Sequence, residues 1–188
     1  MSAWTRKVLL NVIALQVGWF ACVLGAANDL PWLGLPVVVG VLLLHMHLVD
    51  DIRPEMRLVG LSILIGATFD SLLMASGWID YRNGFILTGL APAWILAMWA
   101  QFATTLNLSM AWLKGRPVVA SIAGLIFGPL SWYTGAKLGA IELVNPVAAL
   151  TALAIGWSLV MPLLAIAAQR YNGVFETPQL AADEGLAG

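Results

Sequence analysis

Apolar residues fill six long segments of the chain, and short breaks rich in polar residues, glycine or proline separate them. Each segment is close to the length of about 20 mostly apolar residues that a helix needs to cross a bilayer. The fourth is longer than a crossing requires, so we expect it to tilt or to extend past the interface. The six segments are residues 8–27, 31–49, 57–78, 85–113, 117–138 and 146–169.

This pattern predicts an all-α membrane protein, a bundle of about six transmembrane helices that forms a single domain over residues 1–170. The last residues, 171–188, lack apolar periodicity, so we expect a disordered cytoplasmic tail there. Composition agrees: 61% of the 188 residues are hydrophobic and 10% are charged, whereas a soluble domain carries about 25% charged residues. A fold in water has no room to bury so much apolar surface, so its solvent must be lipid.

The distribution of lysine and arginine predicts the orientation of the bundle. If the N-terminus is cytoplasmic, only Arg82 and Lys137 of the nine basic residues lie outside. The positive-inside rule favours this arrangement over its inverse, and it places both termini in the cytoplasm. The seven residues on the cytoplasmic side are Arg6, Lys7, Arg53, Arg57, Lys114, Arg116 and Arg170.

One carboxylate, Asp70, lies well inside the third apolar segment. A charge in hydrocarbon is costly and usually faces a partner or a wet cavity. Asp70 is about 13 residues past Arg57, or roughly 20 Å along a helix, which places it in the outer half. Trp132, Tyr133 and Lys137 of the fifth segment lie at a similar depth.

Two interpretations of this layer remain open. In the first, Asp70, Trp132, Tyr133 and Lys137 form a ligand-binding pocket that opens to the periplasmic side, with Asp70 as proton acceptor or cation ligand. In the second, Asp70 and Lys137 form a structural ion pair that locks the third and fifth segments together.

A second group of polar residues lies in the inner half of the predicted bundle. Gln101, Thr104, Thr105 and Ser109 recur near helical spacing in the fourth segment, so part of this run must face protein. Helices that run in opposite directions bring other polar residues to the same depth. The candidate inner cluster is Asn11, His45, Gln101, Thr104, Thr105 and Asn107.

Several kinds of chemistry find no support in the sequence. His45 and His47 are two positions apart and point to different faces of a helix, so we expect no metal site there. The single Cys22 excludes an intramolecular disulfide, and a net charge of −1 argues against nucleic acid as a partner. No phosphate loop, dinucleotide fingerprint or Gly-x-Ser-x-Gly elbow is present, so we expect no cofactor, and no specific reaction is indicated.

Small residues predict where helices pack closely. Gly124-x-x-x-Gly128 and Gly135-x-x-x-Gly139 have the spacing that lets two membrane helices approach each other. Pro129 follows Gly128 directly, so we expect the fifth helix to break there.

Three phrases of the sequence resemble a family of small bacterial inner-membrane proteins of unknown function. They are residues 16–27, Phe102-Ala-Thr-Thr-Leu-Asn107 and Gly128-Pro-Leu-Ser-Trp-Tyr133. The resemblance covers nearly all of the six segments and implies a multi-pass protein of the bacterial inner membrane. Members are often encoded beside cyclopropane-fatty-acid-synthase-like methyltransferases and flavin amine-oxidase-like proteins, which implies a setting of lipid modification.

The leading functional hypothesis is a protein that binds or moves a lipid-like or small amphipathic ligand in the pocket around Asp70. A second is an intramembrane enzyme that modifies acyl chains, with His45 or Asp70 as acid or base. A third is a membrane scaffold for a soluble lipid-modifying enzyme, held by the basic cytoplasmic loops. The expected partners are therefore membrane lipids and, in the third case, that soluble enzyme.

Overall fold

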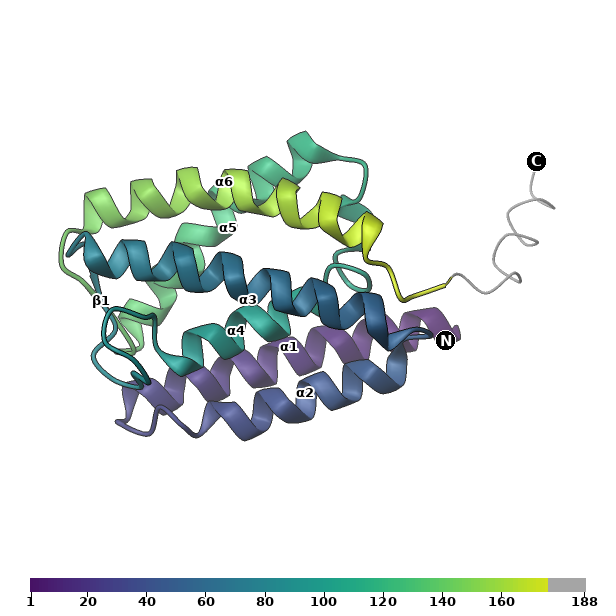
Figure 1. Ribbon diagram of the computed structural model, residues 1–188, viewed down its shortest axis with the longest axis horizontal. Helices are drawn as coiled ribbons and strands as arrows, with labels where there is room; N and C mark the ends of the chain where they lie inside the picture. The colour runs from purple at the N-terminus through teal and green to yellow at the C-terminus, as the bar shows by residue number, and fades with distance from the viewer. Residues whose placement is uncertain (176–188) are drawn as a thin grey trace.

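The computed structural model describes residues 1–175, and six α-helices form a bundle in this part of the chain (Figure 1). Two short strands join the connections at one end of the bundle. The elements are α1 Ala3–Ala27, α2 Gly34–Leu48, α3 Ile52–Ala75, β1 Ile79–Asp80, α4 Ala93–Ala103, the 3-10 helix η1 Ala111–Leu113, α5 Pro117–Lys137, β2 Glu142–Leu143 and α6 Pro146–Arg170.

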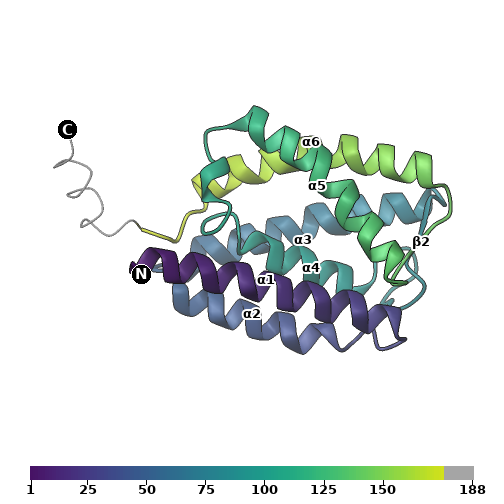
Figure 2. The same ribbon diagram turned by 180° about the vertical axis from the view of Figure 1, so that it is seen from behind.

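Helix α4 lies at the centre of the bundle. It packs on α1, α2 and α3, while α5 and α6 pack mainly on each other (Figures 1 and 2). Trp94, Ile95 and Trp99 of α4 are each at most 2% exposed. The central position of α4 explains why its polar residues are hidden from both lipid and water.

Local sequence fixes the starts of several helices. The Ser2 hydroxyl accepts a hydrogen bond from the Thr5 N–H at 3.1 Å and caps α1. Asp51 caps α3 by accepting from the Arg53 N–H at 3.0 Å, and Asn145 caps α6 in the same way. Such caps satisfy backbone donors that have no partner within the helix.

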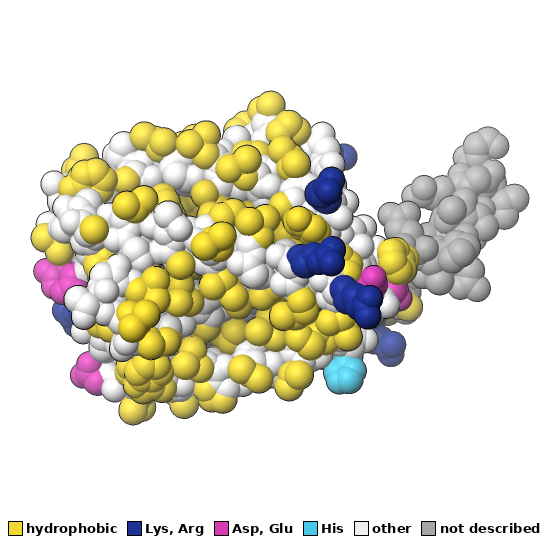
Figure 3. Space-filling view, viewed as in Figure 1, with side chains coloured by type: hydrophobic (Ala, Val, Ile, Leu, Met, Phe, Trp, Pro, Cys, Tyr) yellow, Lys and Arg dark blue, Asp and Glu magenta, His cyan; other side chains and the backbone are white. Residues whose placement is uncertain are grey.

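Four helices, α1, α3, α5 and α6, are long and apolar enough to cross a membrane. Helices α2 and α4 have only 15 and 11 residues. The protein is therefore an all-helical membrane protein with four full-length candidate spans among residues 1–175. Apolar side chains cover its flanks, and Leu64, Phe127 and Leu159 are each more than 60% exposed (Figure 3).

The expectation of one long helix over residues 85–113 is wrong. Helix α4 ends at Ala103, and a chain of turns leads from it to η1. The hydroxyls of Thr104 and Thr105 donate to the carbonyl oxygens of Gln101 and Phe102 at 2.6 and 2.7 Å. Residues 103–108 are all buried, and irregular backbone at membrane depth is tolerated where protein covers it.

The close approach predicted at Gly124 and Gly128 is confirmed, and the partner is Trp157 of α6. A Cβ atom on Gly124 would lie 2.1 Å from the Trp157 carbonyl oxygen, and one on Gly128 would lie 2.4 Å from the Trp157 ring. The equivalent position on Gly135 meets only Ile141, at 4.0 Å. The break expected at Pro129 is wrong, because α5 continues through this residue.

The predicted tail lies mostly outside the described residues, which end at position 175. Its first residues, Tyr171–Phe175, do not behave as a free tail. Val174 is only 5% exposed, and Gly173 bonds to the start of α3. The folded unit therefore extends at least to residue 175.

Candidate functional site

Asp70 of α3 accepts hydrogen bonds from two neutral donors. Its Oδ1 accepts from the Tyr81 hydroxyl at 2.5 Å, and its Oδ2 accepts from the Trp99 indole N–H at 2.6 Å. The Trp132 indole N–H donates to the Tyr81 oxygen at 3.2 Å. Asp70 and Tyr81 are 0% exposed. We call Asp70, Tyr81, Trp99 and Trp132 the Asp70 network.

The fold brings these four side chains together from four parts of the chain. Tyr81 directly follows β1, whose pairing with β2 ties the α3–α4 connection to the α5–α6 connection. Gly66, one turn before Asp70, leaves space for Trp99, since a Cβ atom there would lie 2.1 Å from the indole ring. Trp99 also stacks on Trp157, with ring centroids 4.7 Å apart.

The ion pair expected between Asp70 and Lys137 is absent among the described residues. The Lys137 ammonium lies 5.2 Å from the centre of the Tyr133 ring, and both side chains are exposed. Of the four candidate ligand-binding residues, the structure brings together Asp70 and Trp132 only. Positions 132 and 133 point to different faces of α5, so one is buried in the network and the other faces outward.

Neutral donors take the place of a cation around Asp70. Burial raises the pKa of the Tyr81 phenol well above its usual range. Tyr81 therefore keeps its proton and remains a donor to the carboxylate. An indole N–H is a donor only, so the Trp99 bond requires that Oδ2 act as an acceptor. Both carboxylate oxygens of Asp70 therefore act as acceptors for buried neutral donors.

A narrow cleft lies between α1, α4 and α5 beside this network. Its volume is about 20 Å³, which is room for one water molecule. Trp19, Met98 and Ser131 line it and are partly exposed, so it reaches the surface of the bundle. The Trp19 indole N–H donates to the Ser131 hydroxyl at 3.3 Å across it. Trp132 forms part of its wall.

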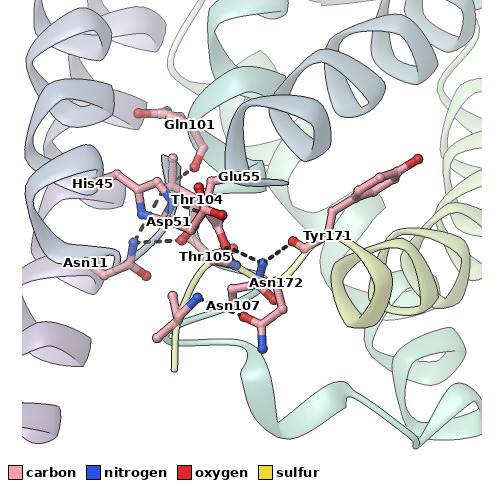
Figure 4. Close-up of polar contacts among 12 residues, drawn as sticks. Asn11, His45, Asp51, Glu55, Gln101, Thr104, Thr105, Asn107, Tyr171 and Asn172 are labelled. Carbon is pink, nitrogen blue, oxygen red and sulfur yellow. Dashed lines mark hydrogen bonds and ion pairs between the residues drawn. The ribbon is translucent and has the colours of Figure 1, made fainter. Parts of the chain in front are cut away.

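A second buried carboxylate, Glu55, joins several elements at the other end of α3 (Figure 4). Its Oε2 lies 2.9 Å from His45 Nε2, and the two side chains are 2% and 3% exposed. Its Oε1 accepts from the Asn107 amide at 2.7 Å and from the Gly173 N–H at 2.8 Å. We call Glu55, His45 and Asn107 the Glu55 network.

The remaining residues of the predicted inner cluster are buried but form separate contacts. Asn11 of α1 donates to the Thr104 carbonyl oxygen at 3.1 Å and accepts from the Ser109 hydroxyl at 2.6 Å. Gln101 lies against α1, where a Cβ atom on Gly18 would come within 1.8 Å of its Oε1. The predicted cluster is therefore three local groups around the break after α4.

Sequence reasoning missed Glu55 and Tyr81. Glu55 lies among polar residues that read as a loop, and Tyr81 lies in a connection. A signal for Glu55 was present, because Glu55, Ser62 and Asp70 fall on one helical face and all three are buried in α3. Nothing comparable marks Tyr81. Among residues 1–175, no three His, Cys, Asp or Glu side chains gather as a metal site would require.

Comparison with known families gives one match. A family described as "Protein of unknown function (DUF2878)" matches residues 8–163. No curated protein and no solved structure matches the chain.

Proposed function

The chain belongs to the DUF2878 family, and we propose that it is a membrane protein that binds or moves a lipid-like or small amphipathic ligand. The family carries no assigned activity, so the proposal rests on the cleft beside the Asp70 network. Two of the four long apolar helices, α1 and α5, contribute to its walls, and this supports a site among the spanning segments. The ligand is an acyl chain or similar tail with a polar group that can donate a hydrogen bond.

The membrane topology belongs to the same proposal. We place all six helices across a bacterial inner membrane, with both termini in the cytoplasm. The start of α1 and the end of α6 lie at the same end of the bundle (Figure 1), and lysine and arginine side chains gather at that end (Figure 3). In this orientation, an impermeant thiol reagent reaches a cysteine at the exposed position 175 only from the cytoplasmic side.

The cleft supports a lipid-like ligand because its walls are apolar and it opens toward the surrounding hydrocarbon. One hydrogen bond, from Trp19 to Ser131, closes it, and such a bond contributes only about 1 kcal/mol. A tail of several carbons needs more space than one water molecule, so it enters by displacing the Trp19 indole. Its polar group then donates to the Tyr81 hydroxyl oxygen beside Trp132, and Tyr81 in turn donates to Asp70.

A substitution that fills the cleft tests this proposal. Ser131→Trp is expected to reduce the lipid retained by the purified protein by about tenfold, which corresponds to about 1.4 kcal/mol. Native mass spectrometry after extraction in mild detergent measures the retained lipid. Ile126→Trp is the matched control, because Ile126 lies on the same helix and is 51% exposed. Equal lipid retention by the parent and both variants would contradict the proposal.

The Glu55 network favours one alternative, an intramembrane enzyme acting on acyl chains. Glu55 bonds to one ring nitrogen of His45, while His45 Nδ1 is buried and has no hydrogen-bond partner among the described residues. A histidine oriented in this way by a carboxylate is a typical general base.

Lipid profiles of a deletion strain and a His45→Ala strain separate the two functions. If the protein is a carrier, the deletion strain redistributes existing lipids between membranes or leaflets. If it is an enzyme, both strains lose one product and accumulate its precursor. A soluble lipid-modifying enzyme as partner, in the setting that the family resemblance implies, remains a further prediction.

A further inference from the structure

Residues Tyr171–Phe175 follow α6 and lie against the α2–α3 connection and the start of α3; Figure 4 shows Tyr171 and Asn172 beside Asn107 and Glu55. The Gly173 N–H donates to Glu55 Oε1 at 2.8 Å. The Gly173 carbonyl oxygen accepts from the N–H groups of Asp50 and Asp51 at 2.8 and 2.9 Å. The Phe175 N–H donates to Asp50 Oδ2 at 2.8 Å. Both polar groups of the Gly173 backbone are therefore bonded to the α2–α3 connection and α3.

Two further contacts fix this segment. The Asn107 amide, which also bonds to Glu55, donates to the Tyr171 carbonyl oxygen at 2.8 Å. A Cβ atom on Gly173 would lie 1.9 Å from the Asp51 carbonyl oxygen and 2.9 Å from Glu55 Cγ. The first of these atoms is backbone and has little freedom to move. Only glycine fits at position 173 while the segment is in place.

The segment covers the Glu55 network. Glu55 is 1% exposed and His45 is 3% exposed, although both lie near the end of the bundle. Glu55 receives bonds from α2 through His45, from the turns after α4 through Asn107, and from Gly173. Removing the segment would therefore uncover the point where these elements meet.

The segment is held mainly by backbone hydrogen bonds and by few buried apolar contacts, so it can separate from the bundle at low cost. Val174 is its one buried side chain, and Phe175 is 61% exposed. Hydrogen bonds to a loop are replaced by bonds to water when the segment lifts, so their net stabilisation is small. Segments with few buried apolar contacts are the first to unfold locally.

We propose that Tyr171–Phe175 is a releasable strap that closes the cytoplasmic end of the bundle over Glu55 and His45. The inference rests on the proposed function. The strap would be the inner gate of the carrier, and the cleft beside the Asp70 network would be its outer opening. In the closed state, the Glu55 network is shielded from the cytoplasm. When the strap lifts, the network becomes accessible from that side. The carboxylates that bond to the strap are Glu55 and Asp50.

Thiol labelling of position 174 tests the strap. The parent protein carries Cys22→Ala and Val174→Cys, and a Phe175→Cys protein gives the rate at an exposed position. We expect Cys at 174 to react at least about tenfold more slowly than Cys at 175. Adding Gly173→Ala is expected to raise the rate at 174 by about tenfold, because the new Cβ collides with the Asp51 carbonyl oxygen.

Gly60→Ala is the matched control, since nothing lies within 4 Å of a Cβ atom at position 60 of the same helix that bears Glu55. It should leave the rate at position 174 unchanged. If the Gly173→Ala protein does not fold, Asn107→Ala, which removes the bond to Tyr171, should raise the rate in the same direction.

Two results would overturn the strap. In one, cysteines at 174 and 175 are labelled at equal rates; in the other, Gly173→Ala leaves the labelling rate at 174 unchanged. The labelling is done in detergent without added lipid, so it is independent of ligand binding. If Gly173→Ala raises the labelling rate at position 174 but the purified protein retains no lipid, the strap is supported and the proposed carrier function is ruled out.

Discussion

Gly124→Leu is expected to separate α5 from α6 and to cost at least about 3 kcal/mol of folding free energy. Even a Cβ atom at this position would lie 2.1 Å from the Trp157 carbonyl oxygen and 2.9 Å from Met161 Cγ. Overpacking usually costs about 1–3 kcal/mol when side chains can rearrange. Here the obstacle is backbone, so relief requires that one helix move away from the other.

The consequence extends beyond the α5–α6 contact. Trp157 stacks on Trp99, and Trp99 donates to Asp70. Displacing α6 therefore loosens the Asp70 network as well as the helix pair. Denaturant unfolding in detergent, followed by tryptophan fluorescence, measures the loss.

Gly60→Leu is the matched control for this substitution. Gly60 is exposed, with open space around its Cβ position, and leucine is a better helix former than glycine. The control is expected to unfold no earlier than the wild type. If the two leucine variants lose equal stability, the close α5–α6 approach is wrong.

Asp70→Ala is expected to destabilise the protein by about 2–4 kcal/mol. It leaves the Tyr81 hydroxyl and the Trp99 N–H without the acceptor that each now uses. A buried donor left without a partner costs about 1–3 kcal/mol. Asp70→Asn is expected to cost less, about 1–2 kcal/mol, because its amide oxygen still accepts from one of the two donors and only the other donor loses its acceptor.

Comparing these two variants isolates the hydrogen bonds, since both remove the cost of burying a carboxylate. Thermal unfolding in one detergent gives the stability, and native mass spectrometry gives the retained lipid. Asp70→Asn is expected to fold and to retain less lipid. If Asp70→Ala is as stable as Asp70→Asn, the donors have found other partners and the Asp70 network is not what holds this region. Unchanged lipid retention in a folded Asp70→Asn protein would remove Asp70 from the ligand site.

The helical membrane class and the closely packed glycines could be predicted from sequence because they depend on local patterns. Apolar length predicts a span, and the Gly124-x-x-x-Gly128 spacing predicts a close helix contact. The fourth segment was misjudged because hydropathy does not separate a helix from buried turns. Residues 103–108 would be apolar or hydrogen-bonded in a continuous helix and in buried turns alike. Only the packing of other helices around them permits α4 to end at Ala103.

The candidate site was predicted in part for a similar reason. The cost of burying a charge identified Asp70 from sequence alone, but the nature of its partners did not follow. A cation was expected from depth, whereas the structure supplies a phenol and an indole. Tyr81 reaches Asp70 because β1 pairs with β2, and the paired residues are 62 and 64 positions apart in the chain. No periodicity within one segment carries that information.

The central claim is that a lipid-like ligand enters between α1 and α5 and reaches the Asp70 network. An experimental structure of the protein extracted with native lipid tests it most directly. We expect elongated non-protein density between Trp19 and Ser131, with its polar end at Trp132. Density confined to the outer belt, with the Trp19 indole still bonded to Ser131 in every molecule, would contradict the claim.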